Sequence, residues 1–308
     1  MNIYLYIINY PVYEKELCEL EMKSLFGEIP KKKYFYSHIY VDPSRSPFIK
    51  ELIKIISIEE NFSTIVSKIS KEKLHYNEFR VNYVKLEQDK CTYEERLNSM
   101  REIGYAIVGE PNIHNPKNIL AITKENGKWI FGEYERNNYK WHIHQNKPNN
   151  YSNSLGIRVA RALINIAVEN KKKLSLIDPC CGVGTVVIEG LSMGETIKGI
   201  DINKSIVSKA RRNLEFFGYD IDSVKQGSIH DISCKYDVAI VDLPYGLFTP
   251  ISVQEQINII NSARRIALKL ILISFEDMDE IIKSAGFNIV NECTVSKGKF
   301  IRKVQVCI

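Results

Sequence analysis

The stretch Leu174-Ser-Leu-Ile-Asp-Pro-Cys-Cys-Gly-Val-Gly-Thr185 decides how the C-terminal half of this chain folds. Residues 174–177 are mostly apolar and β-prone, which predicts a strand buried on both faces. Pro179 ends that strand, because proline cannot donate a ladder hydrogen bond. The two glycines allow a tight turn, and the residues from Thr185 onward predict a buried helix. A strand, a glycine turn and a helix N-terminus together form a cradle for a nucleotide.

The cradle differs from the dinucleotide-binding pattern Gly-x-Gly-x-x-Gly, because Val187 stands where the third glycine is expected. Asp178 at the strand end could instead hold the ammonium of an amino-acid group, which a pyrophosphate ligand would not need. The pattern resembles motif I of the class I S-adenosylmethionine (AdoMet) methyltransferases. That resemblance assigns cofactor binding to residues in and around the turn: Asp178, Cys180, Gly182, Gly184 and Thr185.

Two further strand ends carry candidate cofactor residues. Residues 196–201 predict a second strand, and Asp201 at its end can take both ribose hydroxyls, in AdoMet or in NAD. A third strand is expected within 222–230. The methyltransferase pattern commonly has an acid after its glycine, contacting the adenine amine. Ser228 occupies that position here, so either Ser228 or Asp231 makes the contact. The resemblance also assigns Ile202 and Ile229 to the cofactor site.

The second decisive motif is Tyr236-Asp-Val-Ala-Ile-Val-Asp-Leu-Pro-Tyr-Gly246. Its apolar centre predicts a buried strand that delivers the last acid, Asp242, to the ligand-binding edge of a parallel sheet. The tetrapeptide 242–245 resembles the Asp/Asn-Pro-Pro-Tyr motif of amino-methyltransferases, with Leu243 replacing the first proline. We expect Asp242 to orient a poorly nucleophilic exocyclic amine, Pro244 to fix the turn, and Tyr245 to stack on an extruded base.

No covalent catalysis is required for this chemistry. Carbon-5 methylation of pyrimidines would need a nucleophilic cysteine, whereas Cys180 and Cys181 belong to the expected cofactor turn. We expect Cys234 and Cys293 to be buried small residues. The cysteines form neither a disulfide framework nor Cys-x-x-Cys metal pairs.

The rest of the C-terminal half predicts two helices, a fifth strand over 269–274, and a terminal hairpin of 287–295 with 300–308. A closing antiparallel strand is typical of the methyltransferase sheet and not of the dinucleotide-binding one. We therefore expect an α/β fold over 150–308, with the seven-stranded Rossmann-like sheet of a class I methyltransferase.

The N-terminal half predicts two α+β domains, 1–65 and 66–147. The first has strands at 2–8 and 38–41 with an amphipathic helix over 14–26 between them. Lys31–Lys33 precede a group of aromatic residues, and this stretch either contacts RNA or forms a solvated strand edge with core aromatics. The second has a strand at 79–85, a helix with the capping box Thr92-Tyr-Glu-Glu95, Asn115-Pro116, and a hairpin turning at Asn126-Gly127. This order resembles a THUMP domain, a tRNA-binding module, behind its small N-terminal companion.

Between the two halves lies a polar linker, 145–153. Trp141-His-Ile-His144 before it has the spacing of a metal pair on a strand, but no further ligands stand nearby, so a structural or RNA-facing strand is expected. After the linker, 154–167 predicts a helix with Ser154 as N-cap. In the RNA methyltransferases that this helix resembles, the loop before it lies near the cofactor, which makes Ser154 a cofactor neighbour.

Composition agrees with a soluble two- or three-domain protein: 308 residues, 44% hydrophobic and 26% charged, with a net charge of +5 and a pI near 8.6. The scattered cysteines predict the reducing cytoplasm. The N-terminus lacks the features of a signal peptide, and no apolar run approaches the roughly 18 residues of a membrane span.

Taken together, the chain resembles the THUMP-containing tRNA guanine-N2 methyltransferases, with AdoMet as cofactor, tRNA as partner and no metal. A DNA adenine or protein glutamine methyltransferase, a non-catalytic protein that retains AdoMet, and an NAD-dependent enzyme remain alternatives. Which nucleotide is modified, whether one or two methyls are added, and whether a partner subunit is needed stay open.

Overall fold

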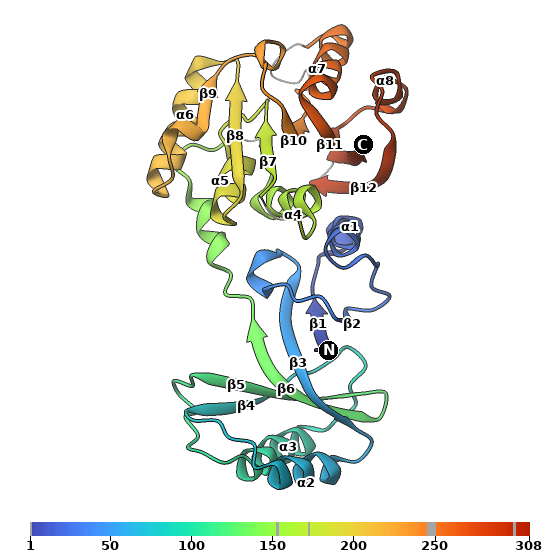
Figure 1. The fold of residues 1–308 in the computed structure, drawn as a ribbon, viewed down its shortest axis with the longest axis vertical. Coiled ribbons are helices and arrows are strands. Elements are labelled where there is room, and N and C mark those ends of the chain that lie inside the picture. The colour runs from blue at the N-terminus through green and yellow to red at the C-terminus, as the bar shows by residue number, and fades with distance from the viewer. Residues whose placement is uncertain (1, 152–153, 172, 245–250, 298–299) are drawn as a thin grey trace. The chain divides into compact units, whose positions relative to one another are not determined.

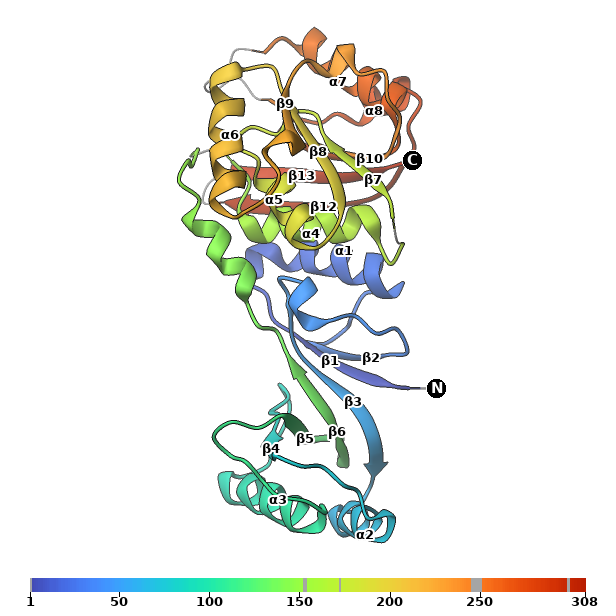
Figure 2. The ribbon, with the colours of Figure 1, turned by 60° about the vertical axis from the view of Figure 1, so that its left-hand side comes forward.

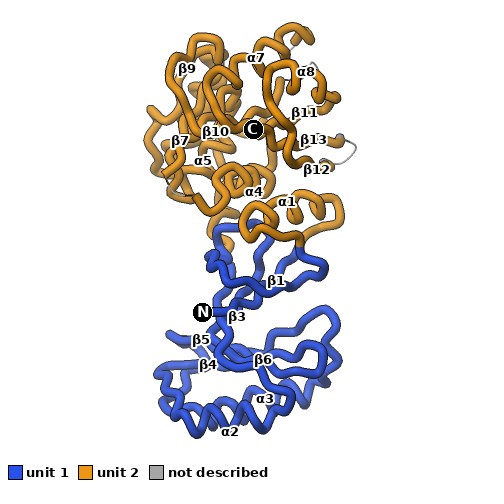
Figure 3. Tube along the Cα trace, turned by 45° about the vertical axis from the view of Figure 1, so that its right-hand side comes forward, with its two compact units in different colours: residues 1–9, 30–138 blue, residues 10–29, 139–308 orange. Residues whose placement is uncertain are grey.

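The computed structural model describes the whole chain except residues 1, 152–153, 172, 245–250 and 298–299. The chain forms two compact units, coloured separately in Figure 3. The first comprises Met1–Asn9 and Pro30–Asn138, and the second comprises Tyr10–Ile29 and Tyr139–Ile308. Most of the predicted ranges 1–65 and 66–147 therefore lies in one unit, whereas Tyr10–Ile29 and residues 139–147 group with the C-terminal residues.

The first unit is built on a six-stranded sheet of order β2-β1-β3-β6-β5-β4, in which only β4 and β5 are parallel. Helices α2 and α3 cover one face of it (Figure 1). The elements in chain order are β1 (Tyr4–Ile8), β2 (Tyr34–Ser37), η2 (Pro43–Arg45), β3 (Ile49–Glu59), α2 (Phe62–Glu72), β4 (Phe79–Tyr83), α3 (Tyr93–Ala106), β5 (Asn118–Glu125) and β6 (Lys128–Arg136).

Local signals account for several of these elements. Both halves of the predicted capping box form at α3, where Glu95 N donates to Thr92 Oγ1 and Thr92 N donates to Glu95 Oε2. Asn126 and Gly127 have φ angles of 48° and 86°, as a two-residue hairpin turn requires. The predicted strand at 38–41 is wrong, because the strand is β2 at 34–37. Tyr6 Oη accepts from Val41 N and donates to the Ile39 carbonyl, so a side chain satisfies that backbone instead of a sheet neighbour.

The second unit is built on a seven-stranded sheet of order β12-β13-β11-β10-β7-β8-β9. Five strands are parallel, and β13 runs antiparallel between β11 and β12. The strands are β7 (Ser175–Asp178), β8 (Thr196–Asp201), β9 (Val224–Gln226), β10 (Tyr236–Asp242), β11 (Ala267–Ser274), β12 (Ile289–Lys297) and β13 (Phe300–Cys307). The expected Rossmann-like class I methyltransferase fold is confirmed.

Helices pack on both faces of this sheet. They are η1 (Val12–Glu14), α1 (Lys15–Phe26), η3 (Lys140–Asn146), α4 (Ile157–Val168), α5 (Thr185–Ser192), α6 (Lys204–Phe216), η4 (Ile221–Ser223), η5 (Ile229–Asp231), α7 (Val253–Ile266) and α8 (Asp279–Ser284). Helix α1 lies beside α4 (Figure 2), and Asn165 Nδ2 donates to the buried Glu21 carboxylate at 2.6 Å. The apolar face that was predicted for 14–26 is thus buried in the second unit. None of the helices that the structure describes is long and apolar enough to cross a membrane.

Candidate active site

Three acidic residues meet at one edge of the second sheet. Strands β7, β8 and β10 are parallel neighbours, with β7 in the middle. Asp178, Asp201 and Asp242 are each the last residue of their strand. Parallel strands present their carboxyl ends at a common edge, where open α/β sheets bind ligands. The two sequence motifs therefore face the same place.

The glycine turn is tied to the second of these acids. Gly182 N donates to Asp201 Oδ2 at 3.0 Å, and Asn203 N donates to Asp201 Oδ1 at 2.8 Å. Gly182 and Gly184 have φ angles of +53° and +82°, and Gly184 is the N-cap of α5. A β-carbon is strained at such angles, so both positions favour glycine. The open space around Gly182 leaves room for a ligand to approach the backbone.

Burial gives this edge unusual electrostatics. It raises the pKa of Asp178 well above its ordinary value; the neighbouring charges of Asp242 and Asp201 raise it further, against the hydrogen bond from Cys180 N. Burial also raises the pKa of Asp242 to about 6, although the Arg302 guanidinium lowers it. Because like charges crowd a desolvated site, a bound cation would stabilise all three carboxylates.

Two buried oxygens at this edge have no hydrogen-bond partner among the residues that the structure describes: Asp242 Oδ1 and Thr185 Oγ1. Buried polar atoms are usually paired, so an unpaired acceptor beside a strand end indicates a ligand-binding role. These atoms, the acidic charge and the open glycine turn fit a cationic ligand with amine and hydroxyl donors, such as AdoMet.

The residues predicted to surround adenine follow β8 and β9. Ser228 is the N-cap of η5 and accepts from His230 N at 3.2 Å, while Ile229 behind it is buried. Ile202 is 74% exposed, and Asp231 is exposed. His230 ties this loop to α7 through Ser262 Oγ (2.8 Å) and Glu255 Oε1 (2.9 Å). Sequence reasoning missed this histidine, because no motif marks it.

The tetrapeptide after β10 is described in part. Leu243 is buried and its N–H donates to the Ile273 carbonyl at 2.9 Å, so this residue extends the sheet by one bond. The Pro244 carbonyl accepts from Gln256 Nε2 at 3.4 Å. Tyr245, the third predicted catalytic residue, lies outside the described residues.

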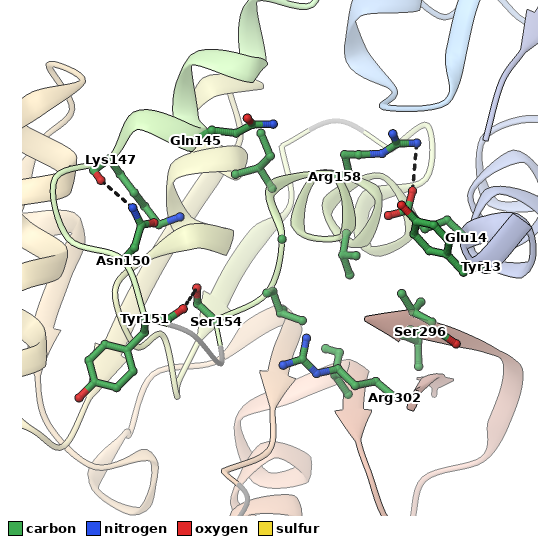
Figure 4. A pocket seen from close by; sticks show the side chains of 17 residues that line it. Tyr13, Glu14, Gln145, Lys147, Asn150, Tyr151, Ser154, Arg158, Ser296 and Arg302 are labelled. Carbon is green, nitrogen blue, oxygen red and sulfur yellow. Dashed lines mark hydrogen bonds and ion pairs between the residues drawn. The ribbon is translucent and has the colours of Figure 1, made fainter. Parts of the chain in front are cut away.

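Ser154 is placed differently from the prediction. The helix begins at Ile157 with Gly156 as N-cap, and Ser154 Oγ instead donates to the Tyr151 carbonyl at 2.8 Å. Ser154 therefore belongs to the loop before α4 and not to the helix. It lines a cavity of about 710 Å3 within the second unit (Figure 4). Of the predicted site residues in the described ranges, this cavity includes Ser154 alone.

The cavity also contains a residue that sequence reasoning missed. Arg302 of β13 is only 6% exposed, and its guanidinium lies 5.2 Å from the centre of the Phe275 ring. It is close enough to Asp242 to lower the pKa of that carboxyl. The arginine follows Asp242 by 60 positions, and only strand pairing brings the two together.

The predicted strand around Trp141–His144 is also wrong, because residues 140–146 form the 3-10 helix η3. His144 Nδ1 lies 2.7 Å from the buried Glu189 carboxylate, which also bonds Arg161 Nη1 at 2.9 Å. This cluster fastens η3 to α4 and α5. In the part of the chain that the structure describes, no three His, Cys, Asp or Glu side chains are grouped to hold a metal ion.

Comparison with known families supports the reading of the C-terminal unit. Residues 145–255 match the family described as "RMKL-like, methyltransferase domain". The tRNA (guanine(10)-N2)-dimethyltransferase of Methanothermobacter thermautotrophicus is 31% identical over 114 residues, which cover 35% of this chain and 34% of that protein. The enzyme of the same name from Pyrococcus abyssi is 27% identical over 146 residues, covering 45% and 44%. The matches thus span less than half of these relatives.

Among solved structures, TrmN from Thermus thermophilus aligns over 99% of both chains with a TM-score of 0.48 and 14% identity. The relation of the chain to the methyltransferases rests on the sequence matches and not on this structural alignment. Those matches concern the C-terminal part of the chain. The predicted relation to methyltransferases is thus confirmed, while the relation to THUMP domains stays a prediction.

Proposed function

We propose that this protein is an AdoMet-dependent RNA methyltransferase that modifies the N2 amine of a guanosine in tRNA. One observation carries the proposal: Asp178, Asp201 and Asp242 converge at one sheet edge, where Asp242 Oδ1 is buried without a partner in the described chain. The match of residues 145–255 to a methyltransferase domain supports the reaction type. The names of the curated relatives support guanine N2 as the acceptor.

The cofactor would lie across the ends of β7, β8 and β9. AdoMet supplies a methyl group on a positively charged sulfur. In the proposed arrangement the acid at the end of β7 attracts the ammonium group, the acid at the end of β8 accepts from the ribose hydroxyls, and apolar residues of the next loops flank adenine. The proposed cofactor set is Ser154, Asp178, Cys180, Gly182, Gly184, Thr185, Asp201, Ile202, Ser228, Ile229 and Asp242.

Asp242 would act on the acceptor amine. The lone pair of a base amine is delocalised into the ring, so the amine is a weak nucleophile. The Asp242 carboxylate accepts an N–H of the amine and orients the lone pair toward the methyl carbon. AdoMet would supply the methyl group: the amine nitrogen would form the new N–C bond, and the electron pair of the broken S–C bond would stay on sulfur. The nitrogen then gives one proton to Asp242, whose pKa of about 6 suits a general base.

Pro244 would fix the backbone beside that carboxylate, and Tyr245 would stack on the extruded base.

The first unit would bind the tRNA as a THUMP-like region. It offers an exposed aromatic ring beside a cation: the Tyr93 side chain is 68% exposed, and the Arg96 guanidinium lies 6.0 Å from its ring. Such pairs suit single-stranded nucleotides and phosphates.

Methyl transfer from labelled AdoMet to unmodified tRNA tests the proposal. We expect label in N2-methylguanosine or N2,N2-dimethylguanosine after nucleoside digestion and mass spectrometry, first at position 10, which the relatives' names specify. Asp242→Ala, which removes both carboxylate oxygens, should abolish transfer. Asp237→Asn is the control. Asp237 lies in the same strand, and its carboxylate only accepts hydrogen bonds from Ser175, which an asparagine side chain can reproduce. Label in N6-methyladenosine, or full activity in Asp242→Ala, would refute the proposal.

A further inference from the structure

The cavity lined by Ser154 lies on the same face of the sheet as Asp242, the residue proposed to act on the acceptor amine. We call it the β13 cavity and define it by Arg302, Val304, Ile273, Ser154 and Tyr151 among its lining residues. Its volume of about 710 Å3 lies in the range of small-molecule sites and exceeds what one nucleoside needs. All of its lining residues belong to the second unit.

Strand register connects the β13 cavity to Asp242. Asp242 of β10 pairs with Ile273 of β11, and Ile273 pairs with Val304 of β13. Paired residues project from the same face of a sheet, and so do residues two apart along a strand. Asp242, Ile273, Val304 and Arg302 therefore share one face, and the last three line the cavity. The side chain of Leu243 projects from the opposite face of the sheet, where it packs in the core against α7.

Arg302 is a buried cation on this face. Its side chain is 6% exposed, packs over Phe275, and points toward the Ser154 side of the cavity (Figure 4). Its positive charge lowers the pKa of Asp242. A guanidinium is always charged and carries only donors, arranged in a planar fork that matches two neighbouring acceptors. Asp242, in contrast, offers acceptors when it is ionised.

Guanine carries a matching pattern. Its 2-amino group is a donor, and its O6 and N7 are neighbouring acceptors that arginine binds in bidentate fashion. Adenine replaces O6 by an amine, which would oppose the guanidinium donors. Resting on the proposed function, we propose that the β13 cavity receives the target base and that Arg302 selects guanine by donating to its O6 edge while the 2-amine faces Asp242.

The test replaces the target guanosine in a synthetic tRNA by 2,6-diaminopurine ribonucleoside. This analogue keeps the 2-amine that is methylated but carries an amine in place of O6. A bidentate arginine contact discriminates by roughly 5- to 150-fold, so we expect the wild-type protein to prefer guanosine by that factor in kcat/KM. Arg302→Gln should bring the ratio close to one, mainly by slowing transfer to guanosine. Arg302→Lys, which keeps the charge but not the fork, should fall between.

Lys303→Gln is the matched control. Lys303 is adjacent in β13, projects from the opposite face and pairs with Asp279 at 2.7 Å. It should leave the preference unchanged. Equilibrium binding of labelled AdoMet and thermal melting report whether each variant is folded. Equal methylation of both RNAs by the wild-type protein would refute the role of Arg302 and leave the proposed function standing. A folded Arg302→Gln variant with the wild-type ratio would do the same. Absence of transfer to guanosine by the wild-type protein overturns the proposed function and this inference with it.

Discussion

Asp242→Asn is expected to stabilise the second unit at neutral pH. The carboxyl has a pKa of about 6 in the folded protein against an ordinary value of 3.8, chiefly because burial disfavours its charged form. A difference of about 2.2 pKa units corresponds to about 3 kcal/mol, at 1.36 kcal/mol per unit. Partial access of water to this residue makes that figure an upper bound.

The sign follows from proton linkage. The folded state holds the Asp242 proton more tightly than the unfolded state, so stability falls as the pH rises from about 4 to about 6 and stays low above that. Asparagine has no such proton and avoids the whole cost at neutral pH. At pH 4 and below, both side chains are uncharged in the folded protein, and the two proteins should be nearly equal in stability.

Thermal melting at pH 4 and pH 7.5 measures the effect. A gain of about 3 kcal/mol shifts the melting temperature of a unit of this size by about 6 to 12 °C, and we expect Asp242→Asn to melt higher by up to that amount at pH 7.5 only. Asp237→Asn should show no such gain, since hydrogen bonds from Ser175 lower the pKa of Asp237. A lower melting temperature for Asp242→Asn at pH 7.5, or an equal gain at both pH values, would refute the assigned desolvation.

Three further substitutions probe the framework of the site. Gly199→Ala would place a β-carbon 2.8 Å from Val187 Cγ2, forcing β8 away from the glycine turn; we expect AdoMet affinity to fall at least tenfold by equilibrium dialysis, and unchanged affinity would contradict this. Glu189→Gln leaves Arg161 buried without its carboxylate and should cost about 3 to 5 kcal/mol in urea unfolding; a loss below 1 kcal/mol would count against it. Thr92→Ala removes the α3 cap and should cost about 1 kcal/mol, while AdoMet binding stays at the wild-type level.

Much of the fold could be predicted because its signals are local. The turn 178–185, the capping box at Thr92 and the Asn126-Gly127 hairpin each specify a backbone conformation within a few residues. The strands of the second sheet are runs of buried apolar residues, so their positions along the chain could be predicted from the sequence. The expected strand ends Asp178, Asp201 and Asp242 stand where they were predicted.

The predictions failed where distant partners decide the local structure. Residues 38–41 read as a strand, but the Tyr6 hydroxyl takes their hydrogen bonds. Residues 141–144 read as an alternating strand, yet burial recurs every third residue, at Trp141, His144 and Lys147, as a 3-10 turn presents them. The sequence marks neither these buried positions nor the Glu189 carboxylate that holds His144.

The sequence by itself determined which residues end the parallel strands and which turn can approach a ligand, because backbone sterics and hydrophobic period act over a few residues. Only the tertiary structure decided that Tyr10–Ile29 belongs to the C-terminal unit, and that Arg302 shares a sheet face with Asp242. Strand pairing across β10, β11 and β13 sets that juxtaposition, and pairing between segments so far apart leaves no periodic trace in the chain.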